Sequence, residues 1–423
     1  MTGDPSWFDA IRCALDVPDD PEAARYLTHA FHAWPARLHP HTARSLVASF
    51  AARSFPDRPG VFADPFMGGG TVLVEAMLAG HSAIGTDLNP IGQEVAWVRT
   101  RRFSRRFLDG LKARLEGFIR QARLFREGEP VDRRLVERVG AWFDAPVLAE
   151  LWSLGAILNA RLDEAPDDAA ARVIRAAMSS IVVKVSRQVS DSVSKVNRPS
   201  NQGAPPRPMR AGTVERWVGA RLHELSGQLD AFADNLPTHA KEAEVFTADA
   251  RKPPLSVGQG APIDAIISSP PYLGVYDYVQ HHLLRLSVLG LDPRALADGE
   301  VGSRREQRRV GDVTAAQRYE DDLEAVLSAW RPRMREGGVL AFMIGDGQLG
   351  QDILPILPLI ERAAPKSGWI PVTAGSQARP AFIPGRRTPG IKEEHLVILA
   401  TGPTAKLAAP SHEPSRGHTK RGR

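Results

Sequence analysis

Three short segments of this 423-residue chain carry side chains that could bind and orient a small ligand. The first reads Asp64-Pro65-Phe66-Met67-Gly68-Gly69-Gly70-Thr71. Glycines have no Cβ and let the backbone approach a ligand closely, and a helix that begins after them offers free amide groups. No Lys followed by Ser or Thr comes after the glycines, which excludes a P-loop.

The second segment ends in an acid. A short apolar stretch, 82–86, leads into Asp87. An acid at the end of this strand is placed to accept hydrogen bonds from ribose hydroxyls in nucleoside-binding sheets. The glycine loop and Asp87 together predict a nucleoside cofactor. A helix cap or a turn is the alternative reading of Asp87.

The third segment, Ser269-Pro270-Pro271-Tyr272, directly follows a short apolar strand. The two prolines fix the backbone and remove two amide donors. The Pro270 carbonyl is then free to accept a hydrogen bond, and the Ser269 hydroxyl can accept another. Tyr272 offers a flat face on which a base can stack. The set suits a planar ring that carries an amino group. In isolation it could be a proline turn capped by tyrosine, but with the two upstream segments it predicts one shared site.

The elements that must position these segments alternate as in a doubly wound α/β sheet: strand, glycine loop, helix, and strand with a terminal acid. We predict an N-terminal segment and cofactor-binding half over 1–100 and a catalytic half over 244–402. Between them, residues 101–243 have helical spacing and predict a helical insertion. A helix is expected over about 319–334, and a strand over 395–400 that is antiparallel to a neighbour.

Charge adds a weaker indication. The net charge is +5, which is compatible with a nucleic-acid partner. Residues 403–423 predict a disordered basic tail. Residues 184–210 are basic and rich in Ser, Asn and Pro, and predict a long exposed loop that could contact nucleic acid. A merely solvated loop is the alternative. The basic run 304–309 could bind a phosphate backbone or be a solvated face.

Other classes of protein are not expected. No run approaches eighteen apolar residues, so no membrane span is predicted. The acidic first thirty residues argue against a secretory signal and favour a cytoplasmic protein. The only cysteine, Cys13, excludes a disulfide framework and is expected to be a buried helix thiol. No metal-ligand spacing is visible, and no metal is predicted.

Taken together, the motifs resemble those of the amino-methyltransferases of DNA, the N4-cytosine and N6-adenine family. The resemblance extends from the glycine loop and the Ser-Pro-Pro-Tyr turn to four further segments: 31–37, 85–90, 247–251 and 272–278. It covers roughly residues 30–100 and 245–400, and the helical insertion poorly. It implies a Rossmann-like S-adenosylmethionine-dependent methyltransferase sheet, which carries the helical insertion.

The resemblance also implies roles for single residues. Cofactor-binding residues would be Asp64, Phe66, Gly68, Gly70, Thr71, Asp87, Asn89 and Asp249. Among them, Asp87 would hold the ribose and Asp249 the adenine amino group of S-adenosylmethionine. The catalytic residues Ser269, Pro270, Pro271 and Tyr272 would hold a flipped base. In the family, Ser at the first position of the turn goes mainly with cytosine N4, and Asp or Asn with adenine N6.

The expected reaction is therefore methyl transfer to the exocyclic amine of a base in double-stranded DNA, most consistent with cytosine N4. Methylation of cytosine carbon five needs a thiolate, and Cys13 lies outside every motif. Enzymes of this family can act beside a restriction endonuclease, and the sequence leaves open whether this chain has such a partner. Three alternatives stay open: an adenine-N6 DNA methyltransferase, an RNA guanine-N2 methyltransferase, and a non-catalytic DNA-binding protein on the same scaffold.

Overall fold

The computed structural model describes residues 1–190, 193–196, 208–350, 352–378 and 393–402. The predicted basic tail and the central part of the 184–210 stretch lie outside these residues. Within them, no helix combines the length and the apolar character that crossing a bilayer requires.

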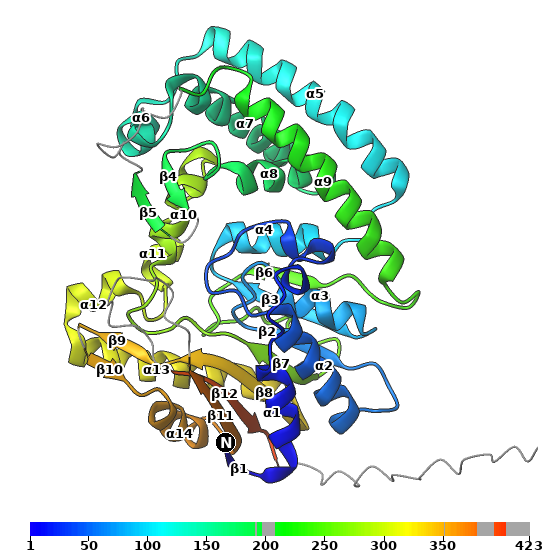
Figure 1. Cartoon of the computed structure of the whole chain (residues 1–423), viewed down its shortest axis with the longest axis vertical. Helices are drawn as coiled ribbons and strands as arrows, with labels where there is room; N and C mark the ends of the chain where they lie inside the picture. Colours follow the sequence, from blue (N-terminus) through cyan, green and yellow to red (C-terminus); the bar gives the residue numbers. More distant parts are fainter. Residues whose placement is uncertain (191–192, 197–207, 351, 379–392, 403–423) are drawn as a thin grey trace, which may run out of the picture.

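An eight-stranded sheet forms the centre of the molecule (Figure 1). Its strands, in spatial order, are β1 (Thr2–Gly3), β11 (Ile370–Ala378), β12 (Glu393–Ala400), β8 (Met334–Gly345), β7 (Ile263–Ser268), β2 (Val61–Asp64), β3 (Ser82–Asp87) and β6 (Glu244–Thr247). From β8 to β6 all neighbours are parallel, whereas β12, β11 and β1 are joined by antiparallel pairings. The predicted α/β fold class is confirmed, as is the antiparallel strand near residue 395.

The chain order reverses next to β2. From β2 the chain moves outward through β3 to β6, and later returns to the other side of β2 through β7 and β8. In open α/β sheets, ligands bind outside the carboxyl ends of the strands at such a reversal. The register Ala63↔Ile266 brings the carboxyl ends of β2 and β7 side by side, so residues that follow either strand can share one site.

Helices cover both faces of the sheet. One face packs against α1 (Phe8–Leu15), α2 (Pro40–Ser54) and α3 (Thr71–Leu78), and the other against α13 (Asp312–Trp330) and α14 (Leu357–Lys366). Successive residues of a strand point to opposite faces; Phe62 accordingly lies in the first core and Ala63 in the second.

The helix predicted over 319–334 corresponds to α13, which begins earlier, at Asp312, and ends at Trp330. The last residue of the predicted range, Met334, already belongs to β8. Cys13 is exposed, which corrects the expected buried thiol.

Residues between α4 (Pro90–Arg99) and β6 form a largely helical body above the sheet (Figure 1). Its elements are α5 (Arg105–Gly128), α6 (Arg133–Val139), α7 (Ala145–Glu164), α8 (Ala169–Ile181), β4 (Gln188–Ser190), β5 (Val193–Val196) and α9 (Thr213–Asn235). The helices share a core of buried aliphatic side chains. The 184–210 stretch is not simply a loop, because β4 and β5 pair within it as an antiparallel hairpin.

Shorter elements complete the catalytic half and the N-terminal region. They are α10 (Tyr278–Val288), α11 (Arg294–Gly299), α12 (Arg304–Val310), β9 (Gly347–Leu349), β10 (Asp352–Leu354), and the 3-10 turns η1 (Pro5–Trp7), η2 (Glu22–Ala24), η3 (Leu27–Ala30), η4 (Gly140–Trp142) and η5 (Arg331–Arg333). The N-terminus of α10 and the loop after α11 both reach the reversal point of the sheet, where they take part in the site.

Candidate active site

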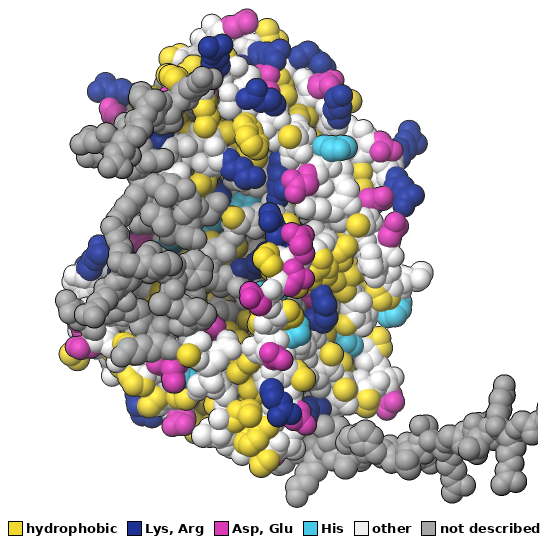
Figure 2. Space-filling model, in the orientation of Figure 1, with side chains coloured by type: hydrophobic (Ala, Val, Ile, Leu, Met, Phe, Trp, Pro, Cys, Tyr) yellow, Lys and Arg dark blue, Asp and Glu magenta, His cyan; other side chains and the backbone are white. Residues whose placement is uncertain are grey.

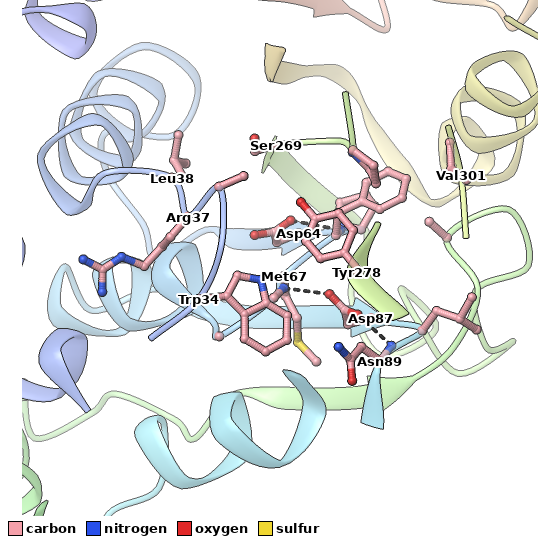
Figure 3. A pocket seen from close by; sticks show the side chains of 18 of the residues that line it. Trp34, Arg37, Leu38, Asp64, Met67, Asp87, Asn89, Ser269, Tyr278 and Val301 are labelled. Atoms are coloured by element: carbon pink, nitrogen blue, oxygen red, sulfur yellow. Dashed lines mark hydrogen bonds between the residues drawn. The ribbon is translucent and has the colours of Figure 1, made fainter. Parts of the chain in front are cut away.

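A cavity lies at the carboxyl ends of the strands where the chain order reverses (Figure 3). It holds about 830 Å³ of empty space, with open solvent at its mouth included. Its walls come from the ends of β2 and β3, the glycine loop, the turn after β7, the segment 34–38 and the loop 299–301.

Most of the residues predicted from the sequence line this cavity. They are Asp64, Phe66, Gly68, Thr71, Asp87, Asn89, Asp249, Ser269 and Pro271. Gly70, Pro270 and Tyr272 do not line it. Segments that are far apart in the chain are thus brought together, as expected from parallel strands whose carboxyl ends meet at one edge.

The glycines of the loop meet different demands. Gly68 has φ +49°, and a Cβ there would lie 2.6 Å from Nε1 of Trp34, which lines the cavity. Gly70 has φ +79°, and a Cβ there would lie 2.9 Å from Cβ of Ala96 in α4. Side chains are disfavoured at both backbone conformations. Gly68 therefore keeps the cavity wall thin, whereas Gly70 allows α3 and α4 to pack closely.

Asp87 connects β3 to the glycine loop. Its Oδ2 accepts a hydrogen bond from the Gly68 amide at 2.8 Å, and its Oδ1 accepts one from the Asn89 amide at 2.8 Å. Burial raises the pKa of Asp87 to about 6 although both amides favour the charged form. The carboxylate faces the cavity with these two bonds already made, and retains further lone pairs for a ligand (Figure 3).

Asp64 ends β2 and is linked to β7. Its Oδ1 accepts hydrogen bonds from the Ser268 hydroxyl at 2.5 Å and from the Phe66 amide at 3.1 Å. Burial raises the pKa of Asp64 to about 7, while the bonds from Ser268 and Phe66 oppose that shift. Ser268 was missed in the sequence, where only its position at a strand end beside Ser269 could have drawn attention to it.

Two buried polar atoms on the cavity wall lack partners. Among the described residues, no hydrogen bond reaches Oγ1 of Thr71 or Nδ2 of Asn89. The other side-chain atom of Asn89, Oδ1, accepts a bond from the Ile91 amide at 3.0 Å and caps α4. Buried polar groups nearly always have a partner. Both atoms therefore indicate a ligand with polar groups at this end of the cavity.

Asp249, at the cavity edge after β6, is already paired. Its Oδ1 accepts a hydrogen bond from Nε of Arg251 at 2.9 Å, and its Oδ2 one from a terminal nitrogen at 2.6 Å. Burial would raise the pKa of Asp249, but the bonds from Arg251 outweigh it and the pKa is lowered. Asp249 thus stays ionised, and its contact with an adenine amino group remains a prediction.

The turn after β7 presents two unpaired acceptors. Within the described part of the chain, neither the Ser269 hydroxyl nor the Pro270 carbonyl has a hydrogen-bond partner. The next carbonyl, of Pro271, accepts a bond from the Tyr319 hydroxyl at 2.7 Å, which fixes the turn from behind. Ser269 is among the residues that line the cavity (Figure 3), so its oxygen is available to a substrate.

Tyr272 is placed differently from the expectation. Its side chain is only 3% exposed, and its hydroxyl donates a 2.6 Å hydrogen bond to Oε1 of Glu394 in β12. The ring packs in the core between the sheet and α13. The predicted stacking of a base on Tyr272 gains no support from this position and remains a prediction.

Several cavity residues were not singled out from the sequence. Trp34 covers Gly68 and contacts the buried ring of His282 on its other side, with 4.5 Å between ring centroids. Tyr278 and Glu300 also line the cavity, and Glu300 accepts a hydrogen bond from the Tyr278 amide. Burial raises the pKa of Glu300 to about 7. Trp34 lies in a segment noted for its resemblance, but Glu300 lies in a loop without any sequence signal.

The comparisons with known proteins also indicate a methyltransferase. No protein-family model matches the chain. The chain is 31% identical over 141 residues to the type II methyltransferase M.MvaI of Kocuria varians. This match spans 33% of the present chain and 31% of that protein, so the chain corresponds to about a third of its curated relative's length.

Among solved structures, the rRNA methyltransferase aviRa from Streptomyces viridochromogenes is 13% identical, with a TM-score of 0.37 over 92% of this chain and 96% of that one. An rRNA methylase from Streptococcus thermophilus is 12% identical, with a TM-score of 0.27 over 87% and 98% of the two chains. Scores this low support no conclusion about the present chain. The curated match and the motifs around the cavity agree, and the chain is similar to the DNA methyltransferase family.

Proposed function

We propose that the protein transfers a methyl group from S-adenosylmethionine to the exocyclic amino group of a flipped base in double-stranded DNA, and that this group is N4 of cytosine. One observation carries the proposal. The turn that contains Ser269 opens on the same cavity as Asp64 and Asp87, and the Ser269 hydroxyl and the Pro270 carbonyl have no partner in the described structure. An acceptor for an amino group, Ser269, thus lines the same cavity as carboxylates suited to a cofactor, and the Pro270 carbonyl is the next residue of the same turn.

The residues of the cavity fit such a cofactor. Asp87 is placed to accept hydrogen bonds from ribose hydroxyls, and the unpaired Thr71 and Asn89 atoms offer further polar contacts. Trp34 and the thin backbone at Gly68 give a flat, close wall. When bound, S-adenosylmethionine would supply a methyl group on a positively charged sulfur atom, which suits a cavity lined by Asp64 and Asp87.

The chain's own residues would act on the acceptor. The lone pair of an exocyclic amine is delocalised into the ring, which makes the nitrogen a poor nucleophile. Hydrogen bonds from the amine to the Ser269 hydroxyl and the Pro270 carbonyl would favour a tetrahedral nitrogen with a localised lone pair. That pair would form the new nitrogen–carbon bond as the carbon–sulfur bond breaks, and the amine would release one proton to solvent. Positioning supplies most of the acceleration, and no covalent enzyme intermediate is needed.

A base in duplex DNA cannot reach a buried cavity while it is stacked, so the mechanism includes base flipping at a cost of about a few kcal/mol.

Figure 2 shows basic and acidic side chains interleaved over the helical body on one face, rather than a uniformly basic surface. In α12, Arg304 binds the Gly274 carbonyl at 3.1 Å and Arg309 pairs with Glu306 at 2.7 Å. Arg308 is exposed and has no described partner, which makes it a candidate for phosphate contact.

Tritiated methyl transfer onto plasmid DNA, followed by digestion to nucleosides and mass identification, tests the proposal. Label in N4-methylcytosine is the expected result. Label in N6-methyladenine would keep the reaction but contradict the base assignment. Label found only in bulk RNA would favour the RNA guanine-N2 alternative, and no transfer at all would favour a non-catalytic DNA-binding protein.

A further inference from the structure

The side chain of Tyr278 projects into the cavity from the first residue of α10 (Figure 3). Two carboxylates hold this end of the helix. Asp277 caps it by accepting a 3.1 Å hydrogen bond from the Gln280 amide, and Glu300 accepts the bond from the Tyr278 amide. Because the backbone is anchored on both sides, the ring has a defined place in the cavity.

The hydroxyl of the half-buried Tyr278 differs from those of the two buried tyrosines. The hydroxyls of Tyr272 and Tyr319 each donate a hydrogen bond to another part of the chain, whereas that of Tyr278 has no hydrogen bond in the described structure. Burial raises the pKa of Tyr278 well above its usual range, and the nearby Tyr276 and Asp87 raise it further. The phenol is therefore neutral at physiological pH, and its ring keeps an electron-rich face.

The chemistry of the cofactor decides what lies against this ring. In S-adenosylmethionine the sulfur atom joins the methionine part to the ribose. If Asp64 lines the methionine part and Asp87 holds the ribose, the sulfur must lie between these two residues. Both residues line the same cavity as Tyr278, and Figure 3 shows its ring over the space between them. The ring would then face the positively charged sulfur.

We propose that Tyr278 determines the preference of the site for the charged cofactor over its neutral product. This inference rests on the proposed function. An aromatic face attracts a cation, and the sulfur is cationic in S-adenosylmethionine but is a neutral thioether in S-adenosylhomocysteine. The ring would therefore strengthen binding before the reaction and lose this attraction after methyl transfer, which favours product release.

Calorimetric titration of the full chain with S-adenosylmethionine and with S-adenosylhomocysteine tests this role. For Tyr278→Leu, we expect the Kd of S-adenosylmethionine to rise by about two- to thirtyfold, with a much smaller change for S-adenosylhomocysteine. Tyr278→Phe keeps the ring and should keep the ratio of the two Kd values. Val301→Ala is the matched control and should also keep this ratio, because Val301 lines the cavity but has no ring.

An equal rise of both Kd values in Tyr278→Leu would show a merely structural role and overturn the inference. Should this variant fail to fold, phenylalanines with increasing ring fluorination at position 278 keep the shape and weaken the attraction. The Kd of S-adenosylhomocysteine divided by the Kd of S-adenosylmethionine should then fall stepwise. A constant ratio would overturn the inference. If the unaltered protein bound neither ligand, the proposed function itself would fail instead.

Discussion

Asp87 holds the backbone of Gly68 in place: its Oδ2 accepts the Gly68 amide hydrogen bond at 2.8 Å while the same carboxylate lines the cavity. The residue proposed to bind the ribose therefore also shapes the loop that is proposed to face the methionine part of the cofactor. Recognition at the end of β3 and the form of the glycine loop depend on one side chain.

Replacing Asp87 tests this double role. Asp87→Ala should raise the Kd of S-adenosylmethionine by at least about tenfold, because hydrogen bonds to a charged group contribute roughly 1.5–3 kcal/mol. Calorimetry measures the Kd. Asp292→Ala, which removes a carboxylate beside Arg294 on the surface, is the control and should leave the Kd unchanged. An unaltered Kd in Asp87→Ala would refute the ribose role.

Asp64 should make the protein less stable as the pH rises. Its pKa is about 7 in the folded protein, above the ordinary value of 3.8, so the folded state binds more protons between these values. The contribution of Asp64 to the free energy of unfolding is therefore greatest below pH 3.8 and falls as the pH rises to about 7.

Asp64→Asn should remove this loss. We expect the variant to have a higher free energy of unfolding at pH 8, by a few kcal/mol at most, and a flatter dependence of that energy on pH. Urea unfolding without cofactor at several pH values measures both. Asp9→Asn, at an exposed position, serves as the comparison and should reproduce the unaltered protein's pH curve. Lower stability of Asp64→Asn at pH 8 would contradict the expectation.

Arg99 supports the glycine loop from behind. It is 1% exposed, donates a hydrogen bond to the Gly69 carbonyl, and contacts His29 at 2.6 Å, which in turn contacts the buried Glu75 at 2.7 Å. Arg99→Met should lower the free energy of unfolding by about 1–3 kcal/mol, because the buried Gly69 carbonyl and the buried ring nitrogen of His29 then lose their hydrogen-bond donor.

Arg44 provides the matched control for Arg99. Its Nε binds Glu75 directly, at 3.2 Å, whereas Arg99 reaches Glu75 only through His29, and the Arg44 side chain is 55% exposed. Arg44→Met should cost no more than about 1 kcal/mol. Chemical unfolding compares the two variants, and equal losses would mean that burial of Arg99 does not set its contribution.

Ser268 and Ser269 are neighbours with separate expected effects. Ser269→Ala removes an acceptor for the substrate amine and should lower turnover by about tenfold or more, with the cofactor Kd unchanged. Ser268→Ala removes the 2.5 Å hydrogen bond to Asp64 and should weaken cofactor binding instead. Methyl-transfer rates and calorimetry separate the two. If both variants changed only the Kd, Ser269 would not act on the acceptor.

The sequence predicts the site well where strand ends define it. Asp64, Asp87 and Ser269 each follow a short apolar strand, and the carboxyl ends of parallel strands meet at one edge. Residues that reach the cavity from elsewhere are not predictable in this way. Tyr278 arrives on the first turn of a helix, and Glu300 in a loop, where no periodic pattern indicates direction.

The position of Tyr272 depends on a long-range pairing. Its hydroxyl binds Glu394, 122 residues later in the chain. The motif indicates an aromatic ring after the prolines, but the direction of the ring is set by β12, whose place between β8 and β11 cannot be derived from local sequence. The β4–β5 hairpin was missed for a different reason: the composition of this stretch resembles that of a loop.

The insertion of β12 between β8 and β11 also has a consequence for synthesis on the ribosome. β8 is complete at Gly345, but its partner on that side is formed only by Glu393–Ala400. Until those residues emerge, the nascent chain carries a long apolar strand with an unpaired edge, which is a template for aggregation. The sheet is complete only when its last described strand, β12, has been made, so early release or a slow final stretch of translation would expose this edge to other chains.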